Sequence, residues 1–179
     1  NKIKEYTEQD TKNSFISPLF QALGWDISSR YEVSSEESQK SGGRVDYGFY
    51  LNGRPIFYVE AKPLKADLDK EEYAHQAINY SWNKGVDYAV LTDFEGIKIF
   101  NSQLIKGALA DRLIFQINYK DYLDDFSRLW LLSKQSFLNK ELDRYADKHS
   151  KRLKKVSVGD KLYKDIQECR RLLTISFRN

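Results

Sequence analysis

The fold is decided by the stretch Gly43-Arg-Val-Asp-Tyr-Gly-Phe-Tyr-Leu-Asn-Gly-Arg-Pro-Ile-Phe-Tyr-Val-Glu-Ala-Lys62. Residues 45–51 and 56–61 are rich in β-branched and aromatic side chains, which favour strands. The dipeptide Asn52-Gly53 between them is a strong short-range signal for a tight turn between antiparallel strands. The stretch therefore predicts a β-hairpin, around which the remaining elements can be placed.

Two acids and a lysine on this hairpin form the candidate chemical site. Asp46 lies on the first strand, whereas Glu60 and Lys62 lie at the end of the second. Two carboxylates can hold Mg²⁺, which keeps several waters and takes few protein carboxylates beside phosphate oxygens. Lys62 projects from the same face as Glu60 because side chains alternate along a strand, so it can orient a nucleophile or stabilise charge. The hairpin thus carries the parts of a metal-dependent phosphodiesterase site.

The register of the hairpin decides whether these side chains meet. A strict two-residue turn pairs Leu51 with Arg54 and turns Asp46 away from the face of Glu60. An odd-membered loop or a β-bulge brings Asp46, Glu60 and Lys62 to one face and the apolar side chains to the other. Taken alone, the residue pattern also fits a hairpin whose charged residues simply face water. We predict an odd loop or a bulge, since the apolar and the charged residues require the same register.

Strand and helix signals alternate in the first two thirds of the chain, and only helix signals follow. An apolar stripe at helical spacing predicts a helix over residues 10–23, which Pro18 either delays or kinks. The other expected elements are a polar loop over 34–43, a helix over 70–84, strands over 87–92, 97–100 and 113–117, and helices from 121 onward. This order predicts an α/β domain followed by a helical segment.

Composition narrows the classes of protein that fit. The chain has 179 residues, of which 41% are hydrophobic and 31% charged, enough for one domain with a real core. Cys169 is the single cysteine, which excludes a disulfide framework and a Cys-based zinc site and suits the reducing cytoplasm. No apolar run approaches the ~18 residues of a membrane span, so no membrane partner is expected. Because the chain begins with Asn1 and contains no Met, we expect a piece of a longer protein.

Charge is distributed unevenly along the chain. Residues 1–133 hold 16 Lys and Arg against 20 Asp and Glu, a net of −4, whereas residues 134–179 hold 13 against 6, a net of +7. The basic excess includes Lys151, Arg152, Lys154 and Lys155. Such a run fits either a solvated helix end or contacts with DNA phosphates, which add affinity without sequence information. Charge alone leaves both interpretations open.

Other catalytic chemistries find little support in the sequence. His75 and His149 lie far apart and lack a third ligand spaced for zinc. The sequence has no Gly-x-Ser-x-Gly elbow for a serine nucleophile, and Gly42-Gly43 lacks the remaining residues of a P-loop. The acids and the lysine of the hairpin therefore remain the leading candidate site.

Several motifs in order resemble one family over roughly residues 5–100. They are Phe-Ile-x-Pro-Leu-x-x-Ala-Leu-Gly-Trp-Asp at 15–26, Gly-Arg-Val-Asp-Tyr at 43–47, Leu-Asn-Gly-Arg-Pro at 51–55 and Val-Glu-Ala-Lys at 59–62. These motifs resemble the nuclease domain of type I restriction R subunits and the N-terminal nuclease of type IIG restriction–modification enzymes, both of the PD-(D/E)xK superfamily. Gln76-Ala-x-x-Tyr80 resembles the Gln-x-x-x-Tyr motif of that family, and Val-Leu-Thr-Asp at 90–93 resembles its next strand.

The resemblance implies a restriction-endonuclease-like fold, a mixed central sheet flanked by helices, and a set of roles for its residues. Asp46 and Glu60, with the Ala61 carbonyl, would bind Mg²⁺ or alternatively Mn²⁺, and Lys62 would complete the catalytic trio. Gln76 and Tyr80 on the next helix would support the site or contact the DNA backbone.

The chain departs from the family pattern at two places. Val45 stands where the superfamily has Pro, and Thr11-Lys12 stands where type I relatives often read Thr-Arg. Glu8, close to the second departure, is an additional carboxylate whose role stays open.

The C-terminal segment resembles the part of type IIG enzymes that leads to their methyltransferase. The motifs concerned lie at residues 129–134, 142–145 and 169–173. We therefore expect an endonuclease domain over residues 1–125 and a helical connector over 126–179, with methyltransferase and target-recognition domains in the missing C-terminal part. The implied function is that of a type IIG-like site-specific deoxyribonuclease, which acts on double-stranded DNA and dimerises transiently for double-strand cleavage. The competing hypothesis is a catalytically inactive nuclease-fold module for DNA binding or assembly.

Overall fold

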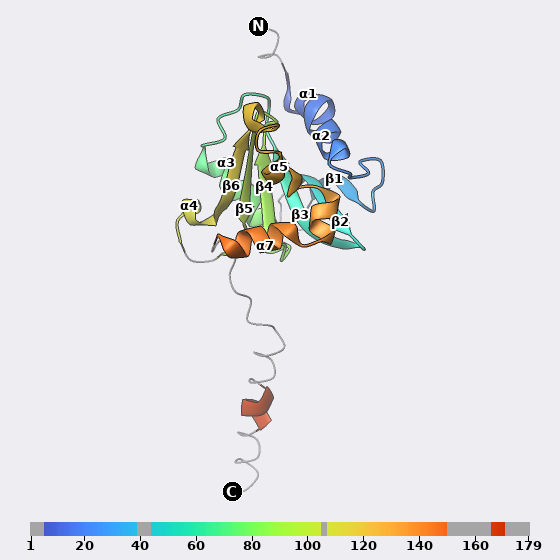
Figure 1. Ribbon diagram of the computed structural model, residues 1–179. Helices are drawn as coiled ribbons and strands as arrows, with labels where there is room; N and C mark the ends of the chain where they lie inside the picture. Colours follow the sequence, from blue (N-terminus) through green and yellow to red (C-terminus); the bar gives the residue numbers. More distant parts are fainter. Residues whose placement is uncertain (1–5, 39–43, 105–106, 150–165, 171–179) are drawn as a thin grey trace, which may run out of the picture.

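A six-stranded mixed sheet forms the centre of the structure, a computed structural model that describes residues 6–38, 44–104, 107–149 and 166–170 (Figure 1). Its strands follow the chain in the order β1-β2-β3-β4-β5-β6, and β3 and β4 form the one parallel pair of neighbours in this sheet. The strands are β1 (Val33–Ser38), β2 (Arg44–Leu51), β3 (Arg54–Ala61), β4 (Tyr88–Thr92), β5 (Gly96–Asn101) and β6 (Leu113–Asn118). The mixed sheet and the hairpin around Asn52-Gly53 that the sequence predicts are confirmed.

Helix α3 (Glu71–Asn83) makes the crossover between the two parallel strands and covers one face of the sheet. Its small and aliphatic side chains allow close packing on the sheet. The residues of this contact cluster are Ala74, Ala77, Ile78, Ala89, Leu91 and Phe100. Gly85, at φ 68°, follows the helix and lets the chain turn back into β4.

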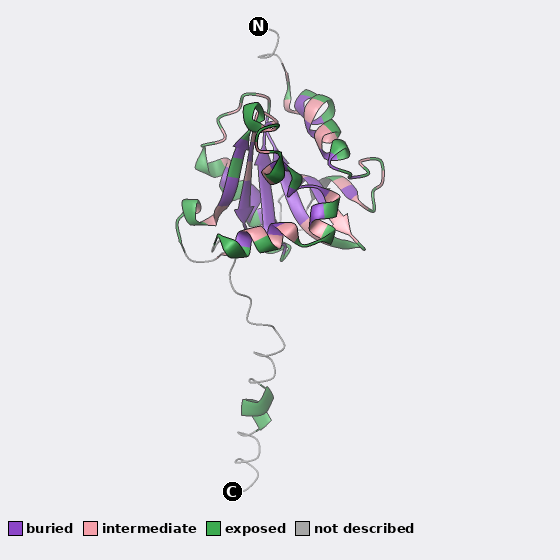
Figure 2. Cartoon of the chain, in the orientation of Figure 1, coloured by how far each residue is buried: buried purple, intermediate pink, exposed green. Residues whose placement is uncertain are grey.

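The opposite face of the sheet carries the larger core, to which three C-terminal helices contribute (Figure 2). These are α5 (Phe126–Trp130), α6 (Lys134–Leu138) and α7 (Glu141–Lys148). Leu132 and Leu142 are buried in the same cluster as Phe49 and Phe57 of the central hairpin. The Trp25 indole nitrogen donates to the Leu132 carbonyl at 2.9 Å. The sheet and the helices up to α7 thus share one core, and the division into a nuclease domain and a connector stays a prediction.

The N-terminal helical run passes through a π-helical segment before its proline. It consists of α1 (Glu8–Thr11), the π-helical η2 (Lys12–Ile16) and α2 (Ser17–Ala22). Thr7 caps its start in a reciprocal capping box with Asp10. Pro18 lies in the first turn of α2, where its missing N–H costs least. The run is longer by two residues at its start than the sequence predicts.

One sequence prediction is wrong. The polar stretch expected to be a loop over residues 34–43 forms strand β1 up to Ser38, paired with β2 from Val33 opposite Phe49 to Ser38 opposite Arg44. β1 lies at the edge of the sheet, where polar and charged side chains are common because they prevent pairing with another chain. Residues 39–43 lie outside the described part of the chain.

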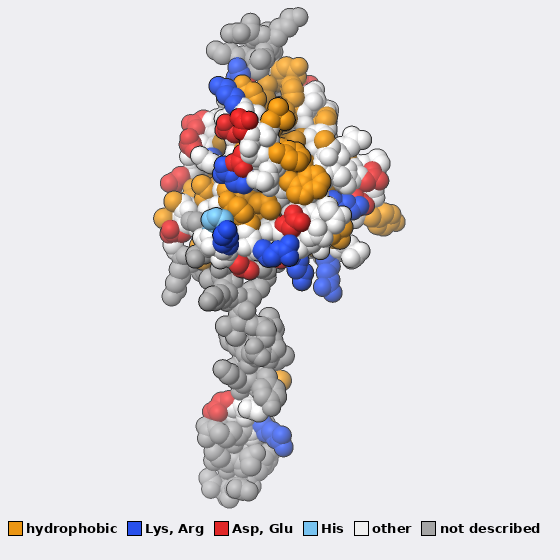
Figure 3. All heavy atoms as spheres, viewed as in Figure 1, with side chains coloured by type: hydrophobic (Ala, Val, Ile, Leu, Met, Phe, Trp, Pro, Cys, Tyr) orange, Lys and Arg blue, Asp and Glu red, His pale blue; other side chains and the backbone are white. Residues whose placement is uncertain are grey.

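Two smaller helical turns and an exposed apolar surface lie outside these layers, and residues 166–170 are also helical. The turns are α4 (Leu109–Arg112) and η3 (Tyr119–Asp121). Phe126 and Trp130 of α5 are 49% and 37% exposed, and Figure 3 shows hydrophobic side chains gathered over this helix. No helix within the described ranges is both long and apolar enough to cross a bilayer.

Candidate active site

A β-bulge in the β2–β3 hairpin sets the register of the site. Leu51 pairs with Arg54 across the turn Asn52-Gly53, whose two residues have φ of 51° and 73°. Such positive φ values belong to the tight turns that match the twist of paired strands. The register then shifts by one residue, so that Phe49 pairs with Phe57. The predicted bulge is therefore present, although the turn itself has only two residues.

The bulge separates the charged and the apolar side chains of the hairpin onto opposite faces. Tyr47 pairs with Val59, and both belong to the larger core. The preceding residue of β2, Asp46, and the following residue of β3, Glu60, therefore lie side by side on the other face. Lys62 follows on that same face. The structure thus brings together the three side chains of the predicted trio.

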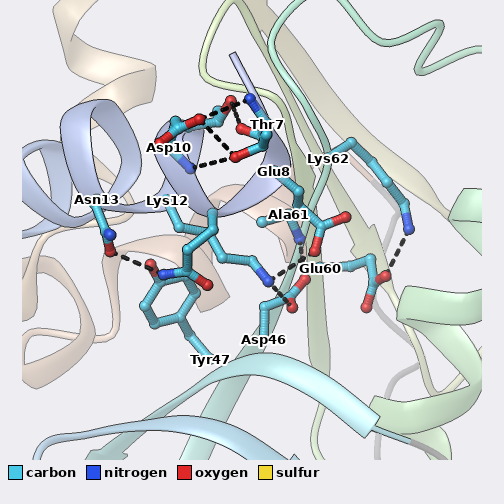
Figure 4. Close-up of polar contacts among 12 residues, drawn as sticks. Thr7, Glu8, Asp10, Lys12, Asn13, Asp46, Tyr47, Glu60, Ala61 and Lys62 are labelled. Atoms are coloured by element: carbon cyan, nitrogen blue, oxygen red, sulfur yellow. Dashed lines mark hydrogen bonds and ion pairs between the residues drawn. The ribbon is translucent and has the colours of Figure 1, made fainter. Parts of the chain in front are cut away.

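Within the trio, Asp46 is bound by a backbone amide, and Glu60 and Lys62 contact each other directly (Figure 4). The Ala61 amide donates to Asp46 Oδ2 at 2.7 Å. Lys62 Nζ donates to Glu60 Oε1 at 2.7 Å. Glu60 and Lys62 are only 4% and 8% exposed, so this ion pair is largely removed from water. Buried charges of this kind persist when each has a partner.

Helix α3 supplies the next contacts to the lysine. Gln76 Oε1 accepts a hydrogen bond from Lys62 Nζ at 3.2 Å, and the Tyr73 ring lies 4.5 Å from the same nitrogen. Tyr80 instead packs edge-on against Tyr58, with ring centroids 4.9 Å apart. The sequence pattern pointed to Gln76 and Tyr80 but missed Tyr73, which lies one helical turn before Gln76 and therefore faces the same way.

A second lysine, absent from the predicted trio, reaches the site from the N-terminal helix. Lys12 Nζ makes a short ion pair with Asp46 Oδ1 and a second ion pair with Glu8 Oε1 at 2.8 Å (Figure 4). The Lys12 side chain is 10% exposed, compared with 41% for Glu8. The sequence marks this residue only through the departure at Thr11-Lys12, and sequence spacing says nothing of a contact across 34 residues.

The electrostatics of the site follow from this burial. The pKa of Glu60 is raised from 4.5 to about 7: burial raises it most, the hydrogen bond from Lys62 opposes this in part, and the nearby Asp46 carboxylate adds to the increase. Burial lowers the pKa of Lys12, but its hydrogen bonds with Asp46 and Glu8 outweigh this, and the net pKa is raised. The carboxylates of Asp46 and Glu60 therefore lie close enough for their negative charges to repel, and a nearby cation stabilises them.

The donor atoms available at this face suit a hard divalent cation. Asp46 and Glu60 offer carboxylate oxygens, whereas the predicted role of the Ala61 carbonyl stays a prediction. Oxygen donors select Mg²⁺ or Mn²⁺, and Mg²⁺ takes only one or two protein carboxylates beside water and phosphate. Across the described residues, no group of three or more His, Cys, Asp or Glu side chains is arranged to hold a metal. Two carboxylates alone would leave the remaining positions around such an ion to water and substrate.

A polar groove opens beside the site. It has a volume of about 320 Å³ and lies between the N-terminal helical run and the start of the sheet. Its walls include Lys12 and Asp46 together with Asn13, Ser17 and Arg30. The groove therefore runs directly along the second lysine and the first acid of the site. The basic run predicted to contact DNA, made of Lys151, Arg152, Lys154 and Lys155, lies outside the described residues.

No family model matches the chain. The chain is 27% identical over 189 residues to the type II restriction enzyme and methyltransferase RM.Eco57I of Escherichia coli, a similarity that covers 96% of this chain. It spans 19% of the length of that relative. The resemblance to restriction enzymes that the motifs predict is confirmed by this similarity.

Two solved structures are also similar to the chain. One is a fragment of a protein assigned as an HsdR subunit of a type I restriction enzyme from Vibrio vulnificus YJ016, with 24% identity, a TM-score of 0.44, and coverage of 53% of this chain and 21% of that one. The other is the type IIG restriction endonuclease BpuSI, with 21% identity, a TM-score of 0.43, and coverage of 69% and 15%.

Proposed function

We propose that this chain is the endonuclease domain of a restriction–modification enzyme and hydrolyses DNA phosphodiester bonds with Mg²⁺. The observation that carries the proposal is the single face on which the hairpin presents Asp46, Glu60 and Lys62. A hairpin that merely exposed charge to water would not need to bury Glu60 to 4% and Lys62 to 8% exposure. Mn²⁺ is the alternative cation, because it takes the same oxygen donors.

Each residue of the site has a defined part in this proposal. When bound, the metal would neutralise charge on the scissile phosphate and lower the pKa of a bound water. Asp46 and Glu60 would hold the ion, and the Ala61 amide would keep Asp46 oriented through its hydrogen bond. The Lys62 ammonium, which Gln76 steadies, would orient the attacking water and stabilise negative charge at the phosphate.

We further propose the context of a type IIG-like enzyme. The similarity over 96% of this chain to a type II restriction enzyme and methyltransferase, of which it spans 19%, supports this context. Methyltransferase and target-recognition domains would then belong to the same longer polypeptide. Two nuclease domains would meet transiently to cut both strands of a DNA duplex.

Plasmid cleavage in Mg²⁺ tests the proposed function. The unchanged chain should nick or linearise plasmid DNA, and EDTA should abolish this activity. Asp46→Ala and Lys62→Ala should each remove it, whereas the control Lys98→Ala, which changes a lysine paired with Asp69 outside the site, should not. Cleavage that persists in both site variants would overturn the assignment. DNA binding without any cleavage by the unchanged chain would instead favour the inactive DNA-binding or assembly module.

A further inference from the structure

The Lys12 ammonium lies between two carboxylates, those of Glu8 and Asp46, at the edge of the site. It contacts Asp46 Oδ1 on one side and Glu8 Oε1, at 2.8 Å, on the other. The first contact joins two largely buried side chains, which are 10% and 15% exposed. Both oxygens of Asp46 are therefore engaged, since Oδ2 already accepts from the Ala61 amide.

This arrangement conflicts with a divalent ion on the same carboxylate. Two cations on one carboxylate repel each other strongly in a site with little water around it. A metal that binds Asp46 must therefore displace the Lys12 ammonium from Oδ1. The Lys62 ammonium pairs with Oε1 of Glu60 and therefore does not occupy either oxygen of Asp46.

Two environments are available to the displaced ammonium, of which one is its present partner Glu8. Glu8 remains as a partner, and it is the more exposed of the two carboxylates, at 41%. The polar groove that Lys12 lines, with Asn13, Ser17 and Arg30, is open beside it and is large enough for a phosphate. A lysine ammonium on a flexible stem is suited to such a move.

We propose that Lys12 is an exchange cation: it occupies Asp46 in the metal-free chain and moves onto a DNA backbone phosphate when the divalent ion binds. Glu8 is a positioning residue that holds the ammonium during this exchange. The inference rests on the proposed metal-dependent function. It makes metal binding and DNA binding mutually favourable, because each step releases or captures the same ammonium.

Titration calorimetry with Mn²⁺ and the full chain, without DNA, gives the first test. Lys12→Met keeps the buried stem and removes the charge, so Mn²⁺ should bind about tenfold more tightly than to the unchanged chain. Lys98→Met is the matched control, since Lys98 is similarly covered, at 16% exposure, and pairs with Asp69 away from the site. That control should leave Mn²⁺ affinity unchanged. Thermal unfolding of each variant checks that it folds.

Addition of a short phosphorothioate DNA duplex at low salt gives the second test. The duplex resists hydrolysis, and low salt favours backbone contacts. DNA should tighten Mn²⁺ binding to the unchanged chain more than to Lys12→Met, because the variant has no ammonium to transfer. Equal tightening in both would overturn the transfer to phosphate.

A double-variant cycle separates the role of Glu8 from that of a metal ligand. Glu8→Gln should weaken Mn²⁺ binding severalfold, because the displaced ammonium then loses its second partner. In the Lys12→Met background the same Glu8 change should have no effect. Weakening that persists in that background would overturn the positioning role and make Glu8 a ligand.

The outcomes distinguish the inference from the proposed function. Mn²⁺ affinity that is unchanged or weaker in Lys12→Met, with normal binding by the unchanged chain, overturns only the exchange role. Failure of the unchanged chain to bind Mn²⁺, even with DNA, overturns the metal-dependent function and the inference with it.

Discussion

The two lysine–carboxylate pairs of the site differ in how their members come together. Lys62 and Glu60 are two residues apart on one strand, and strand alternation alone puts them on one face. Lys12 and Asp46 are 34 residues apart, on a helix and a strand, and meet only when the helix packs beside the sheet. The local pair is therefore a property of the hairpin, whereas the distant pair depends on the packing of the whole domain.

The largest expected effect is a difference in DNA cleavage rate between variants of the two lysines, Lys62 and Lys12. Lys62→Met should lower the rate of DNA cleavage by on the order of 10³-fold, because a charge that stabilises the reacting phosphate is lost. Lys12→Met should lower it much less, since in the metal-bound site the Lys12 ammonium has left Asp46, which the Ala61 amide still orients. Single-turnover cleavage at saturating Mg²⁺ measures both. Equal losses in the two variants would mean that both lysines act directly on the reacting phosphate.

Sequence reasoning reached the local pair and its register for a physical reason. Apolar and charged side chains alternate along both strands, so only one register buries the first set and groups the second. The bulge near Phe49 follows from that requirement. The motifs placed Gln76 on the helix that covers the same face, and the structure puts its side chain on Lys62.

The sequence predicts neither the Lys12–Asp46 ion pair nor the edge strand β1. Lys12 has no periodic relation to Asp46, and helix packing alone sets their contact. Strand β1 consists of serines and glutamates after Val33, a composition typical of loops. Its pairing with β2 comes from backbone hydrogen bonds, which side-chain patterns do not encode. Tertiary context therefore supplied both features.

The difference in unfolding free energy between Glu60→Gln and the unchanged chain should depend on pH, because Glu60 is buried beside Lys62. The folded pKa of Glu60, about 7, lies above its ordinary value of 4.5, so the native state binds more protons in that window. Its contribution to stability is complete below the lower value and is lost as pH rises through the upper one. Between about pH 5 and pH 8, Glu60→Gln should gain on the order of 3 kcal/mol relative to the unchanged chain.

Urea unfolding in EDTA at the two pH values measures this difference. Glu32→Gln is the control, because the hydrogen bond from Lys134 lowers the pKa of Glu32. A lowered pKa affects stability only at more acid pH, so this control should show a constant difference over the same range. A constant difference for Glu60→Gln as well would mean that burial does not destabilise its charged form.

The smallest expected effect concerns the hydrogen bond between Thr11 and Leu64. It joins the helical run that carries Lys12 to the segment that follows strand β3. Thr11 Oγ1 accepts from the Leu64 amide at 2.9 Å and donates to the Thr7 carbonyl at 3.0 Å. Thr11 is fully buried, so the isosteric change Thr11→Val leaves the Leu64 N–H without this acceptor. The expected loss of stability is about 1–2 kcal/mol, the usual consequence of an unmet buried donor.

Amide exchange sharpens this last prediction beyond global stability. The Leu64 amide should exchange faster in Thr11→Val, whereas Ser14→Ala, an exposed change on the same helical run, should alter neither stability nor amide exchange.

If the two lysine–carboxylate pairs are coupled through the Thr11–Leu64 contact, Thr11→Val should also shift Mn²⁺ affinity in the same direction as Lys12→Met, because a loosened helix holds the Lys12 ammonium less firmly on Asp46. Mn²⁺ affinity that stays constant while Leu64 exchange rises would show that the pairs are anchored independently. The exchange role of Lys12 would then depend on its ion pairs alone.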